Sequence, residues 1–200
     1  MINKSFEKYF RKKAVLEPWK IHPIPKLNKF KFIVVIPSYN EGDLILATIN
    51  SIAKQKSIQL KQVLVVVVIN NSDLDKRDII ENNHLTKSSI LKNKFQFEIS
   101  IIDAFDNYPL PQKFAGVGFA RKIGFDLSLT FADSKTIFVA LDADTLISNN
   151  YFEILEKHFN SDGFDCLIPG IKHQKAEKKI EEDAIRQYEK FLFSTANELK

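Results

Sequence analysis

Cysteine, methionine and tryptophan each occur only once in this sequence of 200 residues, and glycine occurs only six times. The single cysteine, Cys166, cannot form an internal disulfide, which is typical of a reducing compartment. The longest purely aliphatic run, residues 63–69, is far shorter than the roughly 20 residues that cross a membrane. The first thirty residues lack the apolar core of a secretory signal. These absences predict a cytoplasmic protein without a membrane span.

The formal net charge of +4 is unevenly distributed along the chain. Residues 1–31 hold nine of the 29 Lys and Arg residues but only two of the 25 Asp and Glu residues, which leaves a net charge of −3 beyond residue 31. Charge therefore gives no support for nucleic-acid binding by the main body. The whole chain has 44% hydrophobic residues and 17 Phe, which predicts a packed globular domain.

Residues 1–30 are predicted to form a basic arm that precedes the main domain. Phe6, Tyr9 and Phe10 recur at helical spacing, with Lys and Arg between them. Two interpretations stay open. In the first, the segment is an amphipathic helix that rests on a partner or on an anionic membrane surface, peripherally at the inner membrane face. In the second, it is a helix that packs on the domain with its basic face in water. The stretch after this segment contains Pro18, Pro23 and Pro25, which predict a stiff, extended linker.

From residue 31 onward, apolar segments rich in β-branched residues alternate with segments of helical periodicity. The predicted strands cover residues 32–36, 63–69, 97–102, 136–141 and 164–168, and Cys166 is predicted as a small core residue of the last one. A charged helix at residues 176–200 closes the chain. This alternation predicts an α/β fold for residues 31–175, with a mostly parallel, Rossmann-type sheet flanked by helices.

Two aspartates separated by one residue, Asp142 and Asp144, follow the fourth predicted strand. In extended geometry residues i and i+2 point to the same side, so both carboxylates are expected to project together. Two neighbouring carboxylates repel each other unless a cation lies between them, and Mg²⁺ or Mn²⁺ prefers such oxygen ligands. The pair is therefore either a metal site or an Asp-rich, helix-capping turn.

Polar residues follow the other predicted strands as well. Residues 37–41 read P-S-Y-N-E, in which Ser38 and Glu41 fit a helix capping box, residues 70–73 read N-N-S-D, and Asp103 ends the third strand. In a parallel sheet the carboxyl ends of the strands meet at one edge, and ligands bind there. The sequence therefore predicts that these residues and the aspartate pair gather at one site.

Four segments, in this order, resemble family 2 glycosyltransferases of the GT-A fold. Residues 34–41, V-V-I-P-S-Y-N-E, resemble the first-strand motif of that family, and residues 70–73 resemble its acidic or Asn-rich turn after the second strand. Residues 118–124, G-F-A-R-K-I-G, resemble the segment of its central helix with an A-R-N motif between two glycines. Residues 142–144, D-A-D, occupy the D-x-D position. The resemblance covers about residues 31–170.

The resemblance implies binding of a nucleotide-diphosphate sugar, UDP- or GDP-linked, and transfer of its sugar to an unknown acceptor. Asp142 and Asp144 would be the catalytic residues and would hold Mn²⁺ or Mg²⁺ on the diphosphate. Asn70 falls where many members place an aspartate that reads the base edge, and Arg121 would assist the phosphates. The implied nucleotide-sugar site comprises Pro37, Ser38, Tyr39, Glu41, Asn70, Asn71, Arg121, Asp142, Ala143 and Asp144.

The chain departs from the family in its acceptor half. Inverting members place a general base well after the D-x-D motif, but only 56 residues follow Asp144. The acidic pair of Glu182 and Asp183 sits inside a charge run, which is typical of a solvated helix face. The sequence is therefore interpreted as the nucleotide-sugar half of a longer enzyme or a member with a reduced acceptor site. The alternatives are a non-catalytic nucleotide-sugar-binding domain or a fragment that docks on a partner or membrane and, through D-A-D-T-L, a phosphatase of the haloacid-dehalogenase type that uses Asp142 and Asp144. His173 is a further candidate for substrate contact.

Overall fold

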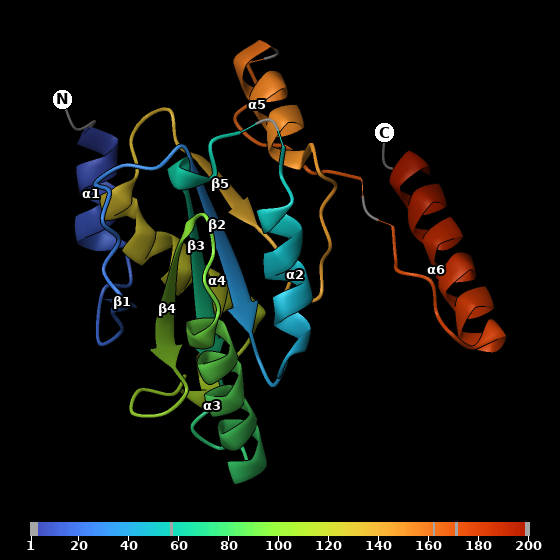
Figure 1. Cartoon of the computed structure of the whole chain (residues 1–200), viewed down its shortest axis with the longest axis horizontal. Helices are drawn as coiled ribbons and strands as arrows, with labels where there is room; N and C mark the ends of the chain where they lie inside the picture. The colour runs from blue at the N-terminus through green and yellow to red at the C-terminus, as the bar shows by residue number, and fades with distance from the viewer. Residues whose placement is uncertain (1–3, 57, 162, 171, 199–200) are drawn as a thin grey trace. The chain divides into compact units, whose positions relative to one another are not determined.

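The structure is a computed structural model that describes residues 4–56, 58–161, 163–170 and 172–198 (Figure 1). Its contacts divide the chain into two compact units, residues 1–158 and residues 159–200. The first unit contains the sheet and the second contains the C-terminal helix.

A five-stranded sheet in the order β1-β4-β3-β2-β5 forms the centre of the first unit. Strands β2 (Phe32–Ser38), β3 (Val63–Asn70), β4 (Glu98–Ala104) and β5 (Ile137–Ala140) are parallel to one another. The two-residue strand β1 (Ile21–His22) pairs antiparallel with β4. The prediction of an α/β fold with a mostly parallel sheet is therefore confirmed.

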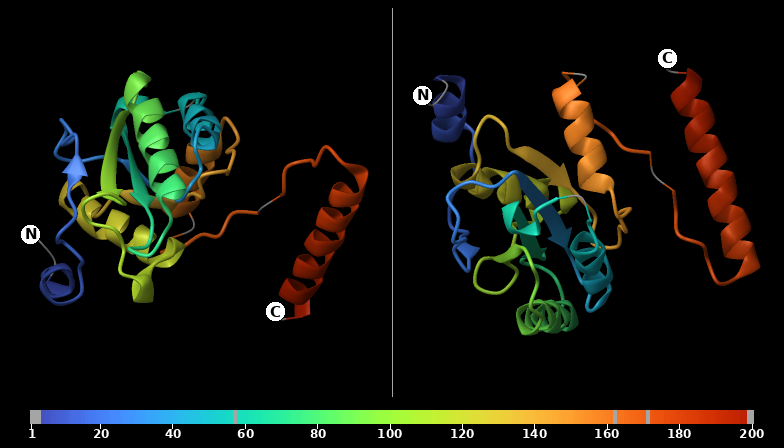
Figure 2. Two further views of the ribbon diagram at one scale, coloured as in Figure 1. Left: turned by 90° about the horizontal axis from the view of Figure 1, so that it is seen from below. Right: turned by 45° about the horizontal axis from the view of Figure 1, so that its top comes forward.

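Helices cover both faces of this sheet. Helix α4 (Val117–Ser128) packs on β2 and β3 from one side, whereas α2 (Leu44–Ala53) and α3 (Arg77–Lys92) lie together on the other side (Figures 1 and 2). Helix α5 (Tyr151–Ser161) follows β5, and short 3₁₀ turns occupy Leu60–Gln62, Gln112–Phe114 and Leu129–Phe131. Every residue of β2 and β3 is buried, as expected for central strands with helices on both faces.

Helix α4 lies unusually close to the sheet because it carries a glycine at the contact. A Cβ atom added to Gly124 would lie 2.4 Å from Cγ1 of Val35 and 2.9 Å from Cγ2 of Val68. Real Cβ atoms do not approach other atoms this closely, so only glycine fits here without a shift of the helix. The close packing fixes the position of α4, whose first turn borders the site described below.

The basic arm is part of the first unit. Helix α1 (Lys4–Lys12) is held by Tyr9, whose hydroxyl donates a hydrogen bond of 2.7 Å to Oδ1 of Asp126 on α4. Trp19 is buried and donates from Nε1 to the carbonyl of Tyr108 at 2.7 Å. The linker predicted from the prolines is wrong at Ile21, because this segment forms strand β1 on the free edge of β4. Helix α1 thus packs on the domain with Lys8, Arg11 and Lys12 exposed.

The predicted strand at residues 164–168 is wrong. These residues are irregular in the structure, with Phe164 49% exposed and Ile168 86% exposed. Cys166 is exposed as well, so the prediction that it lies in a core is also wrong. An apolar run becomes a strand only where a neighbouring strand satisfies its backbone groups, and the described part of residues 159–200 contains no strand.

The predicted capping box is wrong, because the helix begins later than the motif suggests. Ser38 still belongs to β2, and α2 begins at Leu44 after Asp43. Between them the backbone takes positive φ values at Asn40 (58°) and Gly42 (56°), which extends the loop. Glu41 therefore does not reach back to cap the helix.

The second unit contains helix α6 (Lys179–Glu198), whose charged side chains pair with one another. Arg186 donates to Glu182 from Nε at 2.7 Å and pairs with Glu189 through its Nη1. His173 also pairs with Glu189, so the structure gives His173 a partner within its own unit. These bonds lower the pKa of Glu189 to about 2, first through the His173 backbone N–H and then through Arg186. Of the helices in the described ranges, none is long and apolar enough to cross a membrane.

Candidate functional site

A cavity of about 570 Å³ lies at the carboxyl ends of the central strands. This volume suits a small-molecule ligand. The lining residues come from the loops after β2, β3 and β5 and from the start of α4: Pro37, Tyr39, Glu41, Asn70, Ser72, Asp75, Ala115, Gly116, Val117, Asp142, Ala143 and Asp144. The predicted gathering of strand-end residues is thus present for three of the four parallel strands. Asp103 is not among these residues, and it forms an ion pair with Lys87 at 2.7 Å.

The sheet opens toward this cavity because β2 and β5 separate at Pro37. Their pairing ends at Val35 and Ala140, and the last bond between them runs from the N–H of Leu141 to the carbonyl of Val35. In a parallel ladder the next donor toward β5 would be the N–H of residue 37, which proline lacks. The chain after β5 therefore leaves the sheet and turns, and this turn carries both aspartates.

Asp142 and Asp144 lie in a turn, whereas extended geometry was expected. The N–H of Thr145 donates to the carbonyl of Asp142 at 3.1 Å, which closes this turn. Both aspartates nevertheless line the cavity, as does Glu41 from the loop after β2. Helix α5 begins only at Tyr151, so neither aspartate is positioned to cap it.

The three carboxylates interact electrostatically across the cavity. The pKa of Glu41 is raised above its usual value, first by burial and then by the negative charges of Asp144 and Asp142. A cation bound among these groups would relieve the repulsion, and their oxygen atoms suit Mg²⁺ or Mn²⁺. In the described part of the chain no group of three or more His, Cys, Asp or Glu side chains is arranged as a complete metal site. A cation held by Asp142 and Asp144 would therefore need further ligands from a bound molecule.

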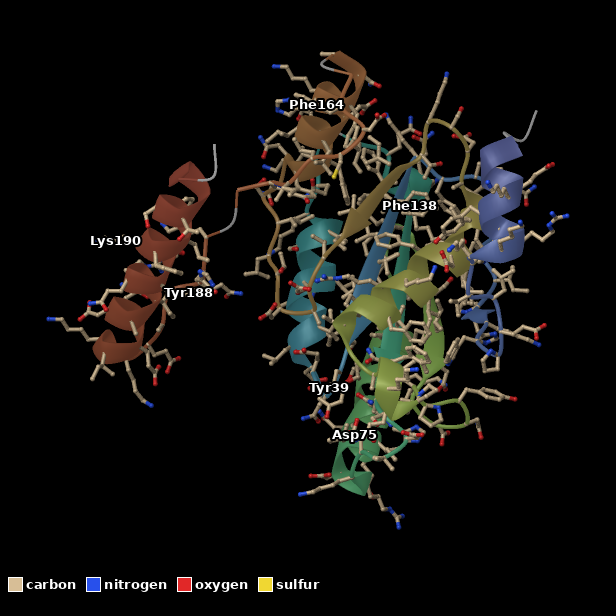
Figure 3. The ribbon with its side chains drawn as sticks, turned by 180° about the vertical axis from the view of Figure 1, so that it is seen from behind. Tyr39, Asp75, Phe138, Phe164, Tyr188 and Lys190 are labelled. Atoms are coloured by element: carbon tan, nitrogen blue, oxygen red, sulfur yellow. The ribbon has the colours of Figure 1, made fainter. Side chains whose placement is uncertain are left out.

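Tyr39 and Asp75 form a second polar contact at the rim of the cavity. The Tyr39 hydroxyl donates to Oδ1 of Asp75 at 3.2 Å, and the two side chains lie next to each other in Figure 3. The other oxygen of Asp75 accepts a bond of 2.7 Å from the N–H of Ser72. Burial and then the Asp75 carboxylate raise the pKa of Tyr39. The ring of Tyr39 is 45% exposed, which leaves it accessible to a ligand.

Comparison with known proteins decides the family. The model of the family described as glycosyl transferase family 2 matches residues 33–200. The chain belongs to glycosyl transferase family 2. This match includes the D-A-D-T-L segment, so it favours the glycosyltransferase interpretation of these residues over the phosphatase interpretation.

Solved structures of S. aureus TarS are similar to this family 2 chain. The structure of TarS 1–349 in complex with UDP-GlcNAc has 18% sequence identity and a TM-score of 0.47, and the match covers 74% of this chain and 39% of that one. The complex of TarS 1–349 with UDP has 18% identity and a TM-score of 0.46, and covers 74% and 40%. The chain thus spans about two fifths of the length of these structures. No curated protein matches it.

Several residues predicted for the family 2 site do line the cavity, whereas three do not. The seven that line it are Pro37, Tyr39, Glu41, Asn70, Asp142, Ala143 and Asp144. Ser38 is fully buried in β2, and its hydroxyl has no hydrogen-bond partner within the described residues. Asn71 is buried and uses its amide on Ser72 and Asn83. Arg121 is also absent from the lining.

The amide group of Asn70 has a fixed orientation. Its Nδ2 donates to the carbonyls of Ser38 (3.0 Å) and Val68 (3.1 Å), and only an NH₂ group can satisfy two carbonyls. The carbonyl of Asn70 accepts a bond from Asn83 at 3.2 Å, and Asn83 also binds the N–H of Asn40. Asn70 therefore ties the ends of β2 and β3 together through its Nδ2.

Sequence reasoning placed Ser72 among the strand-end residues of the predicted site but missed four lining residues: Asp75, Ala115, Gly116 and Val117. Gly116 takes a φ of 146° just before α4, a value that L residues rarely adopt. It places the first turn of α4 at the cavity, where the helix N–H groups have no intrahelical partners. Two features of the sequence could have indicated these residues: the G-V-G sequence just before the helix, and Asp75, two residues beyond the N-N-S-D turn.

Proposed function

We propose that the cavity binds a nucleotide-diphosphate sugar and that the protein transfers the sugar to an acceptor with a divalent metal held by Asp142 and Asp144. One observation carries this proposal: in a chain of glycosyl transferase family 2, a cavity of about 570 Å³ is lined by two strand-end carboxylates, an accessible tyrosine and a helix N-terminus. The similarity to TarS, whose structures contain UDP-GlcNAc or UDP, names ligands worth testing.

The nucleoside would lie between Tyr39 and Asn70. Aromatic rings provide a stacking face for nucleobases. With its Nδ2 used on Ser38 and Val68, Asn70 presents an oxygen, and this oxygen would accept the imino N–H of uracil or guanine. Cytosine and adenine lack this imino N–H, but each carries an amino group that can donate. The proposal therefore gives UDP- and GDP-sugars a preference over CDP- and ADP-sugars and does not exclude the latter.

The diphosphate would lie between the aspartates and the first turn of α4. Gly116 and Val117 bring the positive end of the helix dipole to the cavity, where it favours an anion. Asp142 and Asp144 would hold Mn²⁺ or Mg²⁺, with phosphate oxygens as further ligands. When bound, the cation would stabilise the negative charge that develops on the leaving nucleoside diphosphate.

One assay tests this function: it measures the release of nucleoside diphosphate from nucleotide sugars that differ in their base. We expect the protein, incubated with Mn²⁺, to release nucleoside diphosphate by slow hydrolysis, and to do so faster from a UDP- or GDP-sugar than from a CDP- or ADP-sugar. Addition of EDTA should stop the release because the cation is removed. Binding of UDP or GDP without any release would identify a non-catalytic nucleotide-sugar-binding domain instead. Release of phosphate from generic phosphoesters would support the phosphatase alternative and contradict the proposal.

A further inference from the structure

The outer side of helix α1 carries a cluster of exposed cations. Lys8, Arg11 and Lys12 are all exposed, and they lie within an arc of about 100° on the helix. Tyr9 lies outside this arc, about 60° from Lys12 around the helix, and is bound to Asp126 and Lys122 on α4, at 2.7 Å and 2.9 Å. The helix is therefore attached to the domain through Tyr9 while its cations stay exposed.

Exposed apolar side chains accompany these cations within the same arm. Ile24 is 75% exposed and Leu27 is 41% exposed, on either side of the exposed Lys26. A shallow hollow of about 390 Å³ lies beside α1, lined by Tyr9, Phe125, Asp126, Leu129 and Phe138. Four of these five residues are apolar or aromatic. The arm thus combines positive charge with accessible apolar surface.

We propose that this arm is a docking surface for an anionic phospholipid bilayer. We define the basic arm surface as Lys8, Arg11, Lys12, Lys13, Lys20 and Lys26, all of them exposed. The charge is complementary, because residues 1–31 carry nine cationic and two anionic side chains while the rest of the chain has a net charge of −3. Polybasic segments bind the anionic surface of a membrane, and neighbouring apolar side chains enter its interface.

A bilayer fits this surface better than nucleic acid does. Binding to nucleic acid relies on cations that neutralise phosphates, and it gives no role to exposed aliphatic residues such as Ile24 and Leu27. At a membrane interface the Lys and Arg side chains stay at the headgroups while the aliphatic ones enter the boundary of the acyl chains. The combination of both kinds of side chain therefore favours lipid.

This surface lies away from the cavity, so the inference is independent of the proposed function. Tyr9 neighbours Phe138, near the start of β5, whereas Asp142 follows the end of that strand. In Figure 3 helix α1 lies at the opposite end of the sheet from Tyr39 and Asp75. Charge changes on α1 should accordingly leave ligand binding in the cavity unchanged.

Sedimentation with vesicles tests the inference on the full chain. We expect the protein to sediment with vesicles of phosphatidylcholine and phosphatidylglycerol but not with vesicles of phosphatidylcholine alone. The triple variant Lys8→Glu, Arg11→Glu, Lys12→Glu should lower the partition coefficient more than about tenfold. A triple variant with Gln at the same positions should show a smaller loss, and it serves as the second test if the first does not fold. Raising the salt from about 0.1 M to 1 M should release the protein.

A matched control has the same change in charge on the body of the first unit. Lys54→Glu, Lys61→Glu, Lys92→Glu alters three exposed lysines outside the arm and should keep most of the binding. Equal losses in both triple variants would overturn the inference, because net charge alone would then explain the binding. Equal binding to both kinds of vesicle would also overturn it. So would capture of an RNA oligomer without any binding to anionic vesicles, which would assign the surface to nucleic acid.

Discussion

Arg121 on α4 forms an ion pair with Oδ1 of Asp142, so one of the two cavity aspartates already has a cationic partner. The guanidinium does not line the cavity, and its Nε is buried without a hydrogen-bond partner among the described residues. Asp142 itself faces the cavity and its side chain is 56% exposed. We therefore propose that Arg121 acts on the site through Asp142, as a positioning residue.

The effect of Arg121 on nucleotide binding should depend on Asp142. We expect Arg121→Ala to weaken binding of UDP or GDP with Mn²⁺ by about tenfold, because the Asp142 carboxylate loses its orientation. In the background of Asp142→Asn, the same change should have little further effect. Calorimetric titration of the four proteins in this cycle measures the coupling. Additive losses would show instead that Arg121 binds the nucleotide by itself.

The cluster of three carboxylates should make stability depend on pH through Glu41. Its pKa is raised in the folded protein by burial and by Asp144 and Asp142, so folding disfavours its ionised form. The stability contributed by the protonated form is fully present below the usual carboxyl pKa and is lost as the pH rises through the raised value. We therefore expect Glu41→Gln to increase Tm by about 1–3 °C at neutral pH without metal, but not near pH 4.

Thermal unfolding at these two pH values checks this expectation. Glu17→Gln, at an exposed position outside the helices and strands, is the control and should leave Tm unchanged at both. Addition of Mn²⁺ at neutral pH should reduce or reverse the advantage of Glu41→Gln, because the cation offsets the repulsion. A lower Tm for Glu41→Gln at neutral pH without metal would contradict the electrostatic account.

The contact of α4 with the sheet should tolerate no side chain at position 124. We expect Gly124→Ala to lower the free energy of unfolding by about 1–3 kcal/mol, because the added methyl group would overlap Val35 and Val68. Gly118→Ala on the same helix is the matched control. A Cβ there meets nothing within 4 Å, so this change should be neutral or slightly stabilising. Urea denaturation of both variants compares them, and equal effects would refute the packing argument.

The central sheet could be predicted from sequence because its strands are fully buried. Runs such as 63–69 are apolar at every position only where both faces of a strand are covered. Strand β1 was not predictable, because two residues, Ile21 and His22, carry no periodic pattern and pair only where β4 offers a free edge. Residues 164–168 have the pattern of a strand but no neighbouring strand in the described part of their unit.

Sequence placed most of the lining residues near strand ends, but it could not give the direction of each side chain. Ser38 and Asn71 are next to Tyr39 and Asn70 in the chain but are buried and do not line the cavity, and sequence spacing does not show which of two neighbours at a strand end faces it. Asp75 reaches the cavity through a turn closed by its own bond to the N–H of Ser72. Such turns depend on local hydrogen bonds that no spacing rule anticipates.

The metal-binding role of Asp144 is the central claim, and calorimetric titration of UDP or GDP in the presence of Mn²⁺ tests it most directly. We predict that Asp144→Asn abolishes metal-dependent nucleotide binding while the far-UV circular dichroism and Tm show an intact fold. Asp183→Asn, at an exposed position on α6, is the control and should bind like the unmodified protein. Affinity in Asp144→Asn equal to that of the unmodified protein would contradict the account.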